Sequence, residues 1–333
     1  MAAGNGTIGD QSSCYALVDQ QAAMVLVPVF YSLVFIFSLV GNVLVLVVIC
    51  RGRQKLNSTA VYLLNLALSD CLFTLTLPGR IVYYILGFDW PFGDLLCRIS
   101  TLLFFANTYA GIGFMTCISL DRYLAVVHPQ RLHCLRRVKM VRWICCLVWV
   151  LVSAQVAPVL FRNMLQHDKG RRTCMEYFNL NSSQWMPYFL ILGCVISFCC
   201  PLAAILASYV SVHLKLRAAA ERNPASRKNQ RTNVIILLIL ITFIVCFSPY
   251  HLNVMQFMCR SIHHEVSCEE LRGFKLSSQI TVLLMNFNCC LDPIIYFFAI
   301  KTHKEMLTLF KDRLCPSSNA TSSERAKNTS SNS

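Results

Sequence analysis

Charged side chains are scarce in this 333-residue sequence: they make up 14% of the residues, whereas hydrophobic residues make up 56%. A soluble domain usually carries about 25% charged residues, so the composition argues against a soluble protein. The chain also shows neither the internal repeats nor the paired broken helices that are typical of transporters. It lacks the spacing of metal ligands and the residue constellation of a soluble catalytic site. We therefore expect a protein that is not an enzyme and that needs no cofactor.

The apolar residues are concentrated in seven runs with few or no charges. Two runs contain a single acid each, Asp70 and Asp292, and the other five contain no Asp, Glu, Lys or Arg. A helix that spans a bilayer needs about 20 such residues. The sequence thus predicts an all-α membrane protein, built as a seven-transmembrane helix bundle within residues 23–300. The runs cover residues 24–50, 59–79, 99–120, 143–161, 185–214, 232–259 and 276–300.

Short segments flank the predicted bundle. Residues 1–22 have neither a basic start nor an apolar core, so we expect no cleavable signal peptide. Residues 301–315 predict a short amphipathic eighth helix along the membrane surface, with Cys315 as a palmitoylation site. Residues 316–333 are of low complexity and are expected to form a disordered tail.

Basic residues are distributed unevenly over the two sets of loops. Of the 30 Lys and Arg residues, 21 fall on the side that holds the C-terminus and nine on the side that holds the N-terminus. Basic loops stay in the cytoplasm, so we predict a multi-pass plasma-membrane protein with residues 1–22 as an extracellular tail. The positive inner face suits anionic membrane lipid and a protein partner. Nucleic acid is not expected, because the basic residues are scattered without stacking aromatics.

Most of the 18 cysteines lie within the apolar runs, where they act as small hydrophobic side chains. The side predicted to be extracellular, and therefore oxidising, holds four others: Cys14, Cys97, Cys174 and Cys268. We expect two disulfides, and Cys97 with Cys174 and Cys14 with Cys268 are the pairs considered, but the sequence alone does not fix the pairing. On the same side, Asn5 and Asn181 are candidate glycosylation sites.

The two intramembrane acids suggest one enzyme class that must be weighed. Intramembrane aspartyl proteases work with paired carboxylates that share a proton, and they resemble one another in a Gly-x-Gly-Asp motif. Here Asp70 lies in Leu-Ser-Asp-Cys and Asp292 lies in Cys-Leu-Asp-Pro. The sequence therefore argues against a protease.

A series of short motifs, each in a particular span, gives the chain a family resemblance. Together they resemble the rhodopsin-like (class A) G-protein-coupled receptors, and the match extends over residues 24–314. In chain order the motifs are Gly41-Asn42, LALSD at 66–70, Asp121-Arg122-Tyr123, Trp149, Pro201 with Tyr209, Cys246-Phe247-Ser248-Pro249, and Asp292-Pro293-Ile294-Ile295-Tyr296.

The resemblance implies a switch at the cytoplasmic end of the bundle. An arginine buried at the membrane needs a partner, and Asp121 would hold Arg122 until the sixth helix swings outward and Arg122 meets a G protein. Proline kinks would act as hinges, and tyrosines would bridge the opened core. Arrestin and a receptor kinase would act on the tail. The implied switch residues are Asp121, Arg122, Tyr123, Tyr209, Phe247 (tryptophan in many relatives), Pro249, Asp292, Pro293 and Tyr296.

The resemblance also gathers Asp70, Asn288 and Asp292 into one polar cluster. Two neighbouring carboxylates do not both ionise cheaply, so they would share a proton or hold a cation such as sodium. These three residues form a candidate sodium site. Relatives usually carry a serine on the third helix where this chain has Gly111, which departs from the family pattern.

The ligand class is narrowed by residues that are missing. Amine receptors carry an aspartate where this chain has Phe104, and opsins carry a lysine where it has Asn286. Arg80 is an ionisable residue near the outer end of the second span, and such residues are candidates for a functional site. With Phe105, Tyr109 and Tyr250 it would line an aromatic pocket with few hydrogen-bond donors, which suits a flat, apolar ligand with a few hydroxyl groups. The set proposed is Arg80, Phe105, Tyr109 and Tyr250.

A narrower resemblance points to the oxysterol receptors of this family. It rests on the stretches GRIVYYILGFDWPFGDLLCRI, FANTYAGIGFMTC, RRTCMEY and LLMNFNCCLDPIIYFFA. It implies a dihydroxycholesterol ligand, coupling to inhibitory G proteins and guidance of immune-cell migration. It also implies ligand contacts at Arg80, Tyr109 and Tyr250, with Phe105 in place of a further tyrosine, so that one hydroxyl group is lost.

Two other receptor classes remain open. A chemokine receptor is favoured by Thr76-Leu77-Pro78 and by a Cys14–Cys268 disulfide, but residues 1–22 contain few acids to attract a basic chemokine. A lysophospholipid or nucleotide receptor is favoured by Arg80, which could hold a phosphate, but it would need more cations in the pocket.

Overall fold

The computed structural model describes residues 20–51, 57–130, 132–161, 164–168, 170–174, 185–222, 230–264 and 266–299. Seven segments within this part of the chain are long and apolar enough to cross a membrane, which confirms the predicted seven-helix bundle. The predictions for Cys14, Asn5, Asn181, the eighth helix (301–315) and the tail (316–333) lie outside the described residues.

The spans differ in how many helical pieces they contain. The first is α1 (Gln20–Arg51), the third is α4 (Gly93–Val127), and the fourth is α5 (Val138–Val156) with the turn η2 (Ala157–Phe161). The second comprises α2 (Ser58–Thr74) and α3 (Leu77–Ile85), and the fifth comprises α6 (Met186–Cys194), η4 (Val195–Cys199) and α7 (Cys200–Arg222). The sixth comprises α8 (Gln230–Thr242), η6 (Phe243–Phe247) and α9 (Ser248–His263), and the seventh comprises α10 (Cys268–Asn286) and α11 (Asn288–Ala299).

Three of the interruptions coincide with prolines. Pro78 lies in the first turn of α3, and the π-helical turns η4 and η6 are followed directly by helices that carry Pro201 and Pro249 near their starts. Proline has no N–H, and its ring clashes with the carbonyl four residues earlier, so regular α-helical bonding does not continue through it. A π turn widens the helix locally and accommodates the clash. Pro28 and Pro293, by contrast, lie inside the helices α1 and α11, so not every proline interrupts its span, and the predicted hinge at Pro293 lies within a continuous helix.

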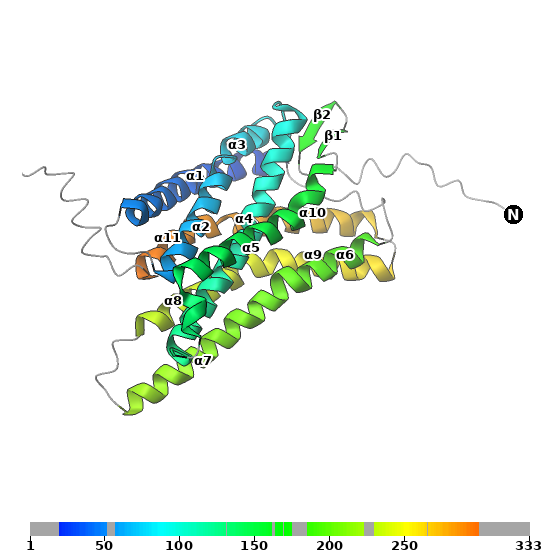
Figure 1. Cartoon of the computed structure of the whole chain (residues 1–333). Helices are drawn as coiled ribbons and strands as arrows, with labels where there is room; N and C mark the ends of the chain where they lie inside the picture. Colours follow the sequence, from blue (N-terminus) through cyan, green and yellow to red (C-terminus); the bar gives the residue numbers. More distant parts are fainter. Residues whose placement is uncertain are drawn as a thin grey trace, which may run out of the picture. The chain divides into compact units, whose positions relative to one another are not determined.

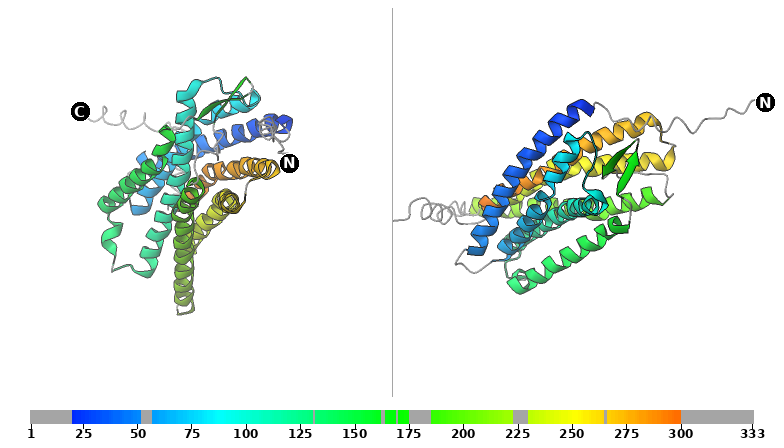
Figure 2. Two further views of the ribbon diagram at one scale, coloured as in Figure 1. Left: turned by 90° about the vertical axis from the view of Figure 1, so that its right-hand side faces the viewer. Right: turned by 90° about the horizontal axis from the view of Figure 1, so that it is seen from above.

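The third span lies at the centre of the bundle. Helix α4 packs against α2 and α7, and it also contacts α5 and α8. Figure 1 shows α4 running through the middle of the bundle from the strands β1 (Leu165–Asp168) and β2 (Arg171–Cys174). In the right-hand view of Figure 2, α1 and α5 lie at two outer edges. Residues on α4 are therefore placed to contact several spans at once.

The bundle has apolar side chains outside and polar side chains inside. Large hydrophobic side chains such as Phe37 on α1 and Trp143 on α5 are 63% and 71% exposed, as expected for surfaces that face lipid. Asn42, Asp70 and Asp292 are fully buried between the helices. In lipid, polar groups must find partners inside the protein, and so the buried polar residues mark the places where the bundle is built for function.

One end of the bundle is covered by a hairpin that the sequence analysis did not anticipate. Strands β1 and β2 pair antiparallel, and Gly170 turns the chain between them with φ of 82°, which glycine adopts without strain. The predicted disulfide between Cys97 at the start of α4 and Cys174 in β2 is present, with 5.8 Å between the Cα atoms. We call this the hairpin end; Asp121 lies near the other end of α4, which we call the opposite end.

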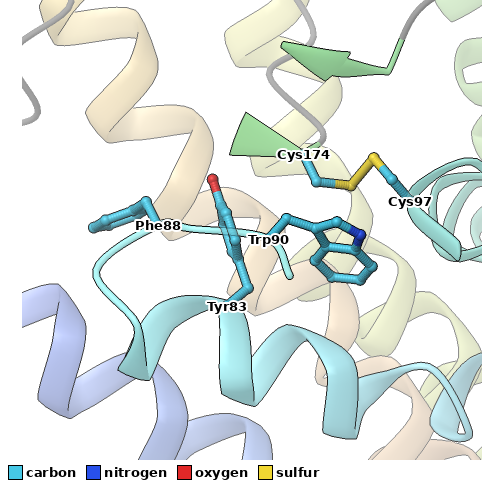
Figure 3. Packing of buried hydrophobic residues seen from close by; sticks show 5 residues of the cluster. All are labelled: Tyr83, Phe88, Trp90, Cys97 and Cys174. Atoms are coloured by element: carbon cyan, nitrogen blue, oxygen red, sulfur yellow. A yellow bond between two sulfur atoms is a disulfide. The ribbon is translucent and has the colours of Figure 1, made fainter. Parts of the chain in front are cut away.

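A row of aromatic side chains packs beside this disulfide. Tyr83 of α3 and Phe88 and Trp90 of the following loop are buried in one cluster with Cys97 and Cys174, and Figure 3 shows Tyr83 between Trp90 and Phe88. The Trp90 backbone N–H donates to the Arg172 carbonyl at 2.8 Å. The hairpin is therefore fixed to both the second and the third spans.

Candidate functional site

Arg80 lies in α3, at the hairpin end, and is buried with only 5% of its surface exposed. Its guanidinium lies over the ring of Phe104, 4.7 Å from the centroid, and also 5.7 Å from the ring of Phe73. These cation–π contacts stabilise the charge in part. Its Nε and Nη2 atoms, however, are buried and make no hydrogen bond within the described residues. Arg80 is thus held inside the bundle with donors that a ligand oxygen could engage.

Aromatic contacts connect Arg80 with the other predicted ligand residues. Phe104, beneath Arg80, contacts Phe105 with 5.1 Å between ring centroids, and Phe105 stacks on Tyr109 at 6.3 Å with 11° between the rings. From Tyr109 the contacts reach His251 of α9 at 6.4 Å, and His251 contacts Tyr250 at 5.3 Å. The structure therefore brings all four predicted residues into one continuous series of contacts, which we call the aromatic layer: Arg80, Phe104, Phe105, Tyr109, Tyr250 and His251.

At the opposite end, Asp121 accepts hydrogen bonds from three side chains. Its Oδ2 accepts from Arg122 Nη2 at 2.9 Å and from the Thr59 hydroxyl of α2 at 2.8 Å. Its Oδ1 accepts from the Nε of Arg136 at 3.0 Å. Arg136 belongs to the short 3-10 helix η1 (His133–Arg136), between the third and fourth spans. The structure thus contains the Asp121–Arg122 contact and adds a second arginine to it.

The remaining switch tyrosines have separate surroundings. The Tyr123 hydroxyl is 3.2 Å from Nε2 of His128, just past the end of α4. Tyr209 of α7 stacks on His213, whose Nδ1 accepts from the Nδ2 of Asn233 in α8 at 3.3 Å. That bond joins the fifth and sixth spans near the opposite end.

Phe247 and Pro293 are packed against glycines. Phe247 is fully buried in η6, and a methyl group on Gly111 would reach its Cζ at 3.5 Å, which is ordinary van der Waals contact. Gly41 of α1 is more restrictive, because a methyl group there would come within 2.5 Å of the Pro293 Cγ. The absence of a side chain at Gly41 therefore allows α1 and α11 to approach closely. Pro249, the other predicted hinge, lies in the first turn of α9.

The buried polar cluster lies between the aromatic layer and the opposite end. Asp70 Oδ1 accepts from the Asn107 side chain at 2.9 Å, and Asp292 is its close neighbour. Within the described residues, several buried atoms make no hydrogen bond: Asp70 Oδ2, both Asp292 carboxylate oxygens, Asn288 Nδ2 and the Tyr296 hydroxyl. Carboxylate oxygens are the ligands that hard cations prefer, so the three residues fit sodium chemically. The sodium site stays a prediction, and the described residues contain no group of three or more His, Cys, Asp or Glu side chains arranged to hold a metal.

Known proteins are similar to this chain in sequence. A family model for the 7 transmembrane receptor (rhodopsin family) matches residues 41–296. G-protein coupled receptor 183 from rat is 46% identical over 298 residues, which are 88% of this chain and 84% of the rat protein. The human protein of that name is 45% identical over 88% of this chain and 82% of its own length. Chicken lysophosphatidic acid receptor 6 is 34% identical over 83% of this chain and 90% of its own length.

The chain belongs to the rhodopsin family of seven-transmembrane receptors. It is therefore a receptor of the G-protein-coupled class rather than an enzyme, and a multi-pass protein of the plasma membrane. The resemblance predicted from the motifs is confirmed at the level of the family and of the G-protein coupled receptor 183 type.

Three residues of this rhodopsin-family receptor were missed by the sequence analysis. Thr59 and Arg136 contact Asp121 from other elements, and no sequence spacing reveals a contact made through the fold. His251 is different, because it is a lone ionisable side chain within an apolar span, next to Tyr250. Ionisable residues in spans are candidates for function, so that rule could have identified it. Of the disulfide residues, Cys268 is disulfide-bonded, and its expected partner, Cys14, lies outside the described residues.

Proposed function

We propose that this receptor recognises a dihydroxylated sterol in the aromatic layer, couples to inhibitory G proteins and guides immune-cell migration. The observation that carries the proposal is Arg80, a buried guanidinium whose Nε and Nη2 lack partners within the described residues. A buried donor without a partner is unfavourable. A hydrogen bond from Arg80 to a ligand oxygen would therefore stabilise the complex more than a hydrogen bond exposed to water does. The similar receptors named G-protein coupled receptor 183 agree with a receptor of that type.

The rest of the aromatic layer matches a sterol in shape and polarity. Phe104, Phe105 and Tyr109 provide stacked or edge-on rings along α4, which suit a rigid, flat hydrocarbon skeleton. Tyr109 and Tyr250 add hydroxyl groups that can donate or accept. A ligand with an apolar body and a few hydroxyl groups would therefore leave few polar atoms unpaired.

A lysophospholipid is the second candidate, because chicken lysophosphatidic acid receptor 6 is 34% identical to this chain. A phosphate carries about two negative charges and is usually bound by several cations or a bidentate arginine. The salt bridges of the described residues do not involve the aromatic layer, and Arg80 is the arginine that we find in it. That arrangement favours the neutral sterol.

The proposed orientation places the hairpin end outside the cell and the opposite end in the cytoplasm. Asp121, Arg122 and Arg136 would then face the G protein, and the basic residues of the opposite end would face anionic lipid. Arrestin and a receptor kinase would act on the cytoplasmic tail at 316–333, which lies outside the described residues.

The test compares ligands and an arginine variant in cells that express the full receptor. We expect dihydroxycholesterols to lower cyclic AMP and to direct migration, whereas lysophosphatidic acid and a chemokine panel leave both unchanged. Arg80→Ala should abolish the response at normal surface expression, and Arg80→Lys should restore it only in part, since lysine lacks the planar fork of arginine. The matched control is Arg272→Ala, which removes an exposed arginine from α10. An unchanged concentration–response curve for Arg80→Ala would refute the ligand site.

A further inference from the structure

His251 is a fully buried histidine within the sixth span. Its Nδ1 lies 2.8 Å from the backbone carbonyl oxygen of Phe247, one turn earlier. A carbonyl oxygen only accepts hydrogen bonds, so Nδ1 must carry the proton that is shared between them. No salt bridge of the described residues involves His251, and an unpaired buried cation would be costly. The imidazole is therefore neutral, and its Nε2 is an acceptor.

The Nε2 atom of His251 is buried and has no hydrogen-bond partner within the described residues. Its direction is fixed by the contacts of the ring. The imidazole stacks on Phe198 with 4.5 Å between centroids and 5° between the planes, and Tyr250 meets it edge-on at 89°. Because Nδ1 is turned back towards the backbone of its own helix, Nε2, across the ring, is turned away from that backbone. Tyr109, a proposed ligand contact, is the neighbour of the ring on α4.

We infer that His251 accepts a hydrogen bond from a ligand hydroxyl group and so selects a ligand that carries an O–H at that position. The inference rests on the proposed function, because it assumes a polyhydroxylated sterol in the aromatic layer. Arg80 has only donors and therefore binds any ligand oxygen, whether it is a hydroxyl, a ketone or an ether. His251 offers the ligand only its Nε2 acceptor, because Nδ1–H is bonded to the Phe247 carbonyl, so a ketone, an ether or a fluorine atom leaves Nε2 unpaired. The receptor thus requires an oxygen atom at the Arg80 end of the ligand and an O–H group at the His251 end.

The pairing of a donor site at Arg80 with an acceptor site at His251 determines which polar groups the ligand must carry. When an analogue lacks the polar group that a site is built to bind, the polar atom of the site remains buried and unpaired. Such a site therefore rejects the analogue more strongly than an apolar pocket does. A sterol with a hydroxyl group at each end meets both sites in either direction, because a hydroxyl both donates and accepts. A ligand with one hydroxyl and one ketone or ether meets both sites only when its hydroxyl group lies at Nε2.

The test is a binding cycle on the intact receptor in membranes. The ligands are a dihydroxycholesterol and analogues in which each hydroxyl group in turn is replaced by fluorine, which removes the donor with little change in size. The variant His251→Phe keeps a flat ring against Phe198 but removes both nitrogens. We expect it to weaken the parent sterol roughly fivefold to tenfold, as for one net hydrogen bond. The fluoro analogue that lacks the hydroxyl group facing His251 should bind the wild type and His251→Phe with equal affinity. The variant His251→Gln should restore part of the preference for the parent sterol.

The outcomes separate this inference from the function on which it rests. If the wild type binds the parent sterol and His251→Phe weakens every analogue by the same factor, or weakens none, the hydroxyl-reading role is overturned and the sterol site stands. If the wild type binds no dihydroxycholesterol, the proposed function itself fails, and this inference fails with it. Equal surface expression of both variants is required in each comparison.

Discussion

Asp121 holds Arg136 as closely as it holds Arg122: the two guanidinium nitrogens lie 3.0 Å and 2.9 Å from opposite oxygens of one carboxylate. The carboxylate is nearly inaccessible, with 3% of the Asp121 side chain exposed, whereas the Arg136 side chain is 27% exposed. The proposed switch requires Arg122 to leave this aspartate on activation. Arg136 would then remain as a counter-charge for the buried carboxylate.

We predict that Arg136→Gln reduces both basal and ligand-stimulated nucleotide exchange several-fold. Without Arg136, the release of Arg122 would leave Asp121 buried with no cation, and a buried unpaired charge is strongly unfavourable. Exchange of a nonhydrolysable GTP analogue on inhibitory G protein measures the effect. Arg217→Gln is the control, because Arg217 is 71% exposed in an ion pair with Glu221 on α7. A rise in basal exchange in the Arg136 variant would contradict this argument.

We predict that Phe105→Tyr strengthens sterol binding by roughly 1 kcal/mol, a typical net hydrogen bond, or about fivefold in Kd. Phe105 stacks on Tyr109, so an added hydroxyl group would extend from the same aromatic surface. Competition binding with a dihydroxycholesterol on matched membranes provides the measurement. Weaker binding of the tyrosine variant would mean that the ligand does not lie along this face of α4.

We predict that Gly41→Ala destabilises the receptor by about 1–3 kcal/mol, the usual range for an overpacked contact. The added methyl group would lie 2.5 Å from Cγ and 2.9 Å from Cβ of Pro293, and neither ring atom belongs to a flexible side chain. Thermal unfolding of purified receptor in detergent should show the loss. Gly273→Ala is the matched control, since nothing lies within 4 Å of the position of its methyl group. Equal melting temperatures for the two variants would argue against close packing of α1 on α11.

We predict that the contact between Asp89 and the hairpin withstands mild acid. Hydrogen bonds from the Arg172 backbone N–H and then from its side chain lower the pKa of Asp89. The stabilisation is therefore complete above the unfolded value of about 3.9 and is lost only as the pH falls through the lower folded pKa. Deuterium uptake at the Arg172 amide, corrected for intrinsic exchange, should remain low at pH 5. Asp89→Ala should raise uptake at neutral pH, and protection lost by the wild type at pH 5 would contradict the assignment.

Composition was sufficient to predict the fold, because seven apolar runs long enough to cross a bilayer admit few other structures. Pro78, Pro201 and Pro249 coincide with three of the breaks in the spans for a local reason, since a missing N–H is a property of the residue itself, whereas Pro28 and Pro293 lie inside continuous helices. The hairpin was missed because residues 165–174 combine charged and polar side chains without a clear alternating pattern.

In the candidate site, too, residues with a local signal in the sequence were predicted, and contacts between distant segments were not. Arg80 stood out because a charge at the outer end of an apolar run is visible in the sequence. Its partners Phe73 of α2 and Phe104 of α4 are set by the packing of the helices. Arg136 lies in a loop rich in basic residues, where no local signal distinguishes the one that turns towards Asp121. Contacts between distant segments depend on how all the helices pack, and they are not predicted from local patterns in a single sequence.

The second span is made of two helices, with α2 ending at Thr74 and the nine-residue α3 beginning at Leu77. Asp70 of the buried polar cluster belongs to the first piece, and Arg80, the proposed ligand contact, belongs to the second, so the two residues lie on separate helices. A substitution in the short helix α3 would therefore alter the proposed ligand contact and leave in place α2, which carries Asp70 and the Asp121 contact Thr59.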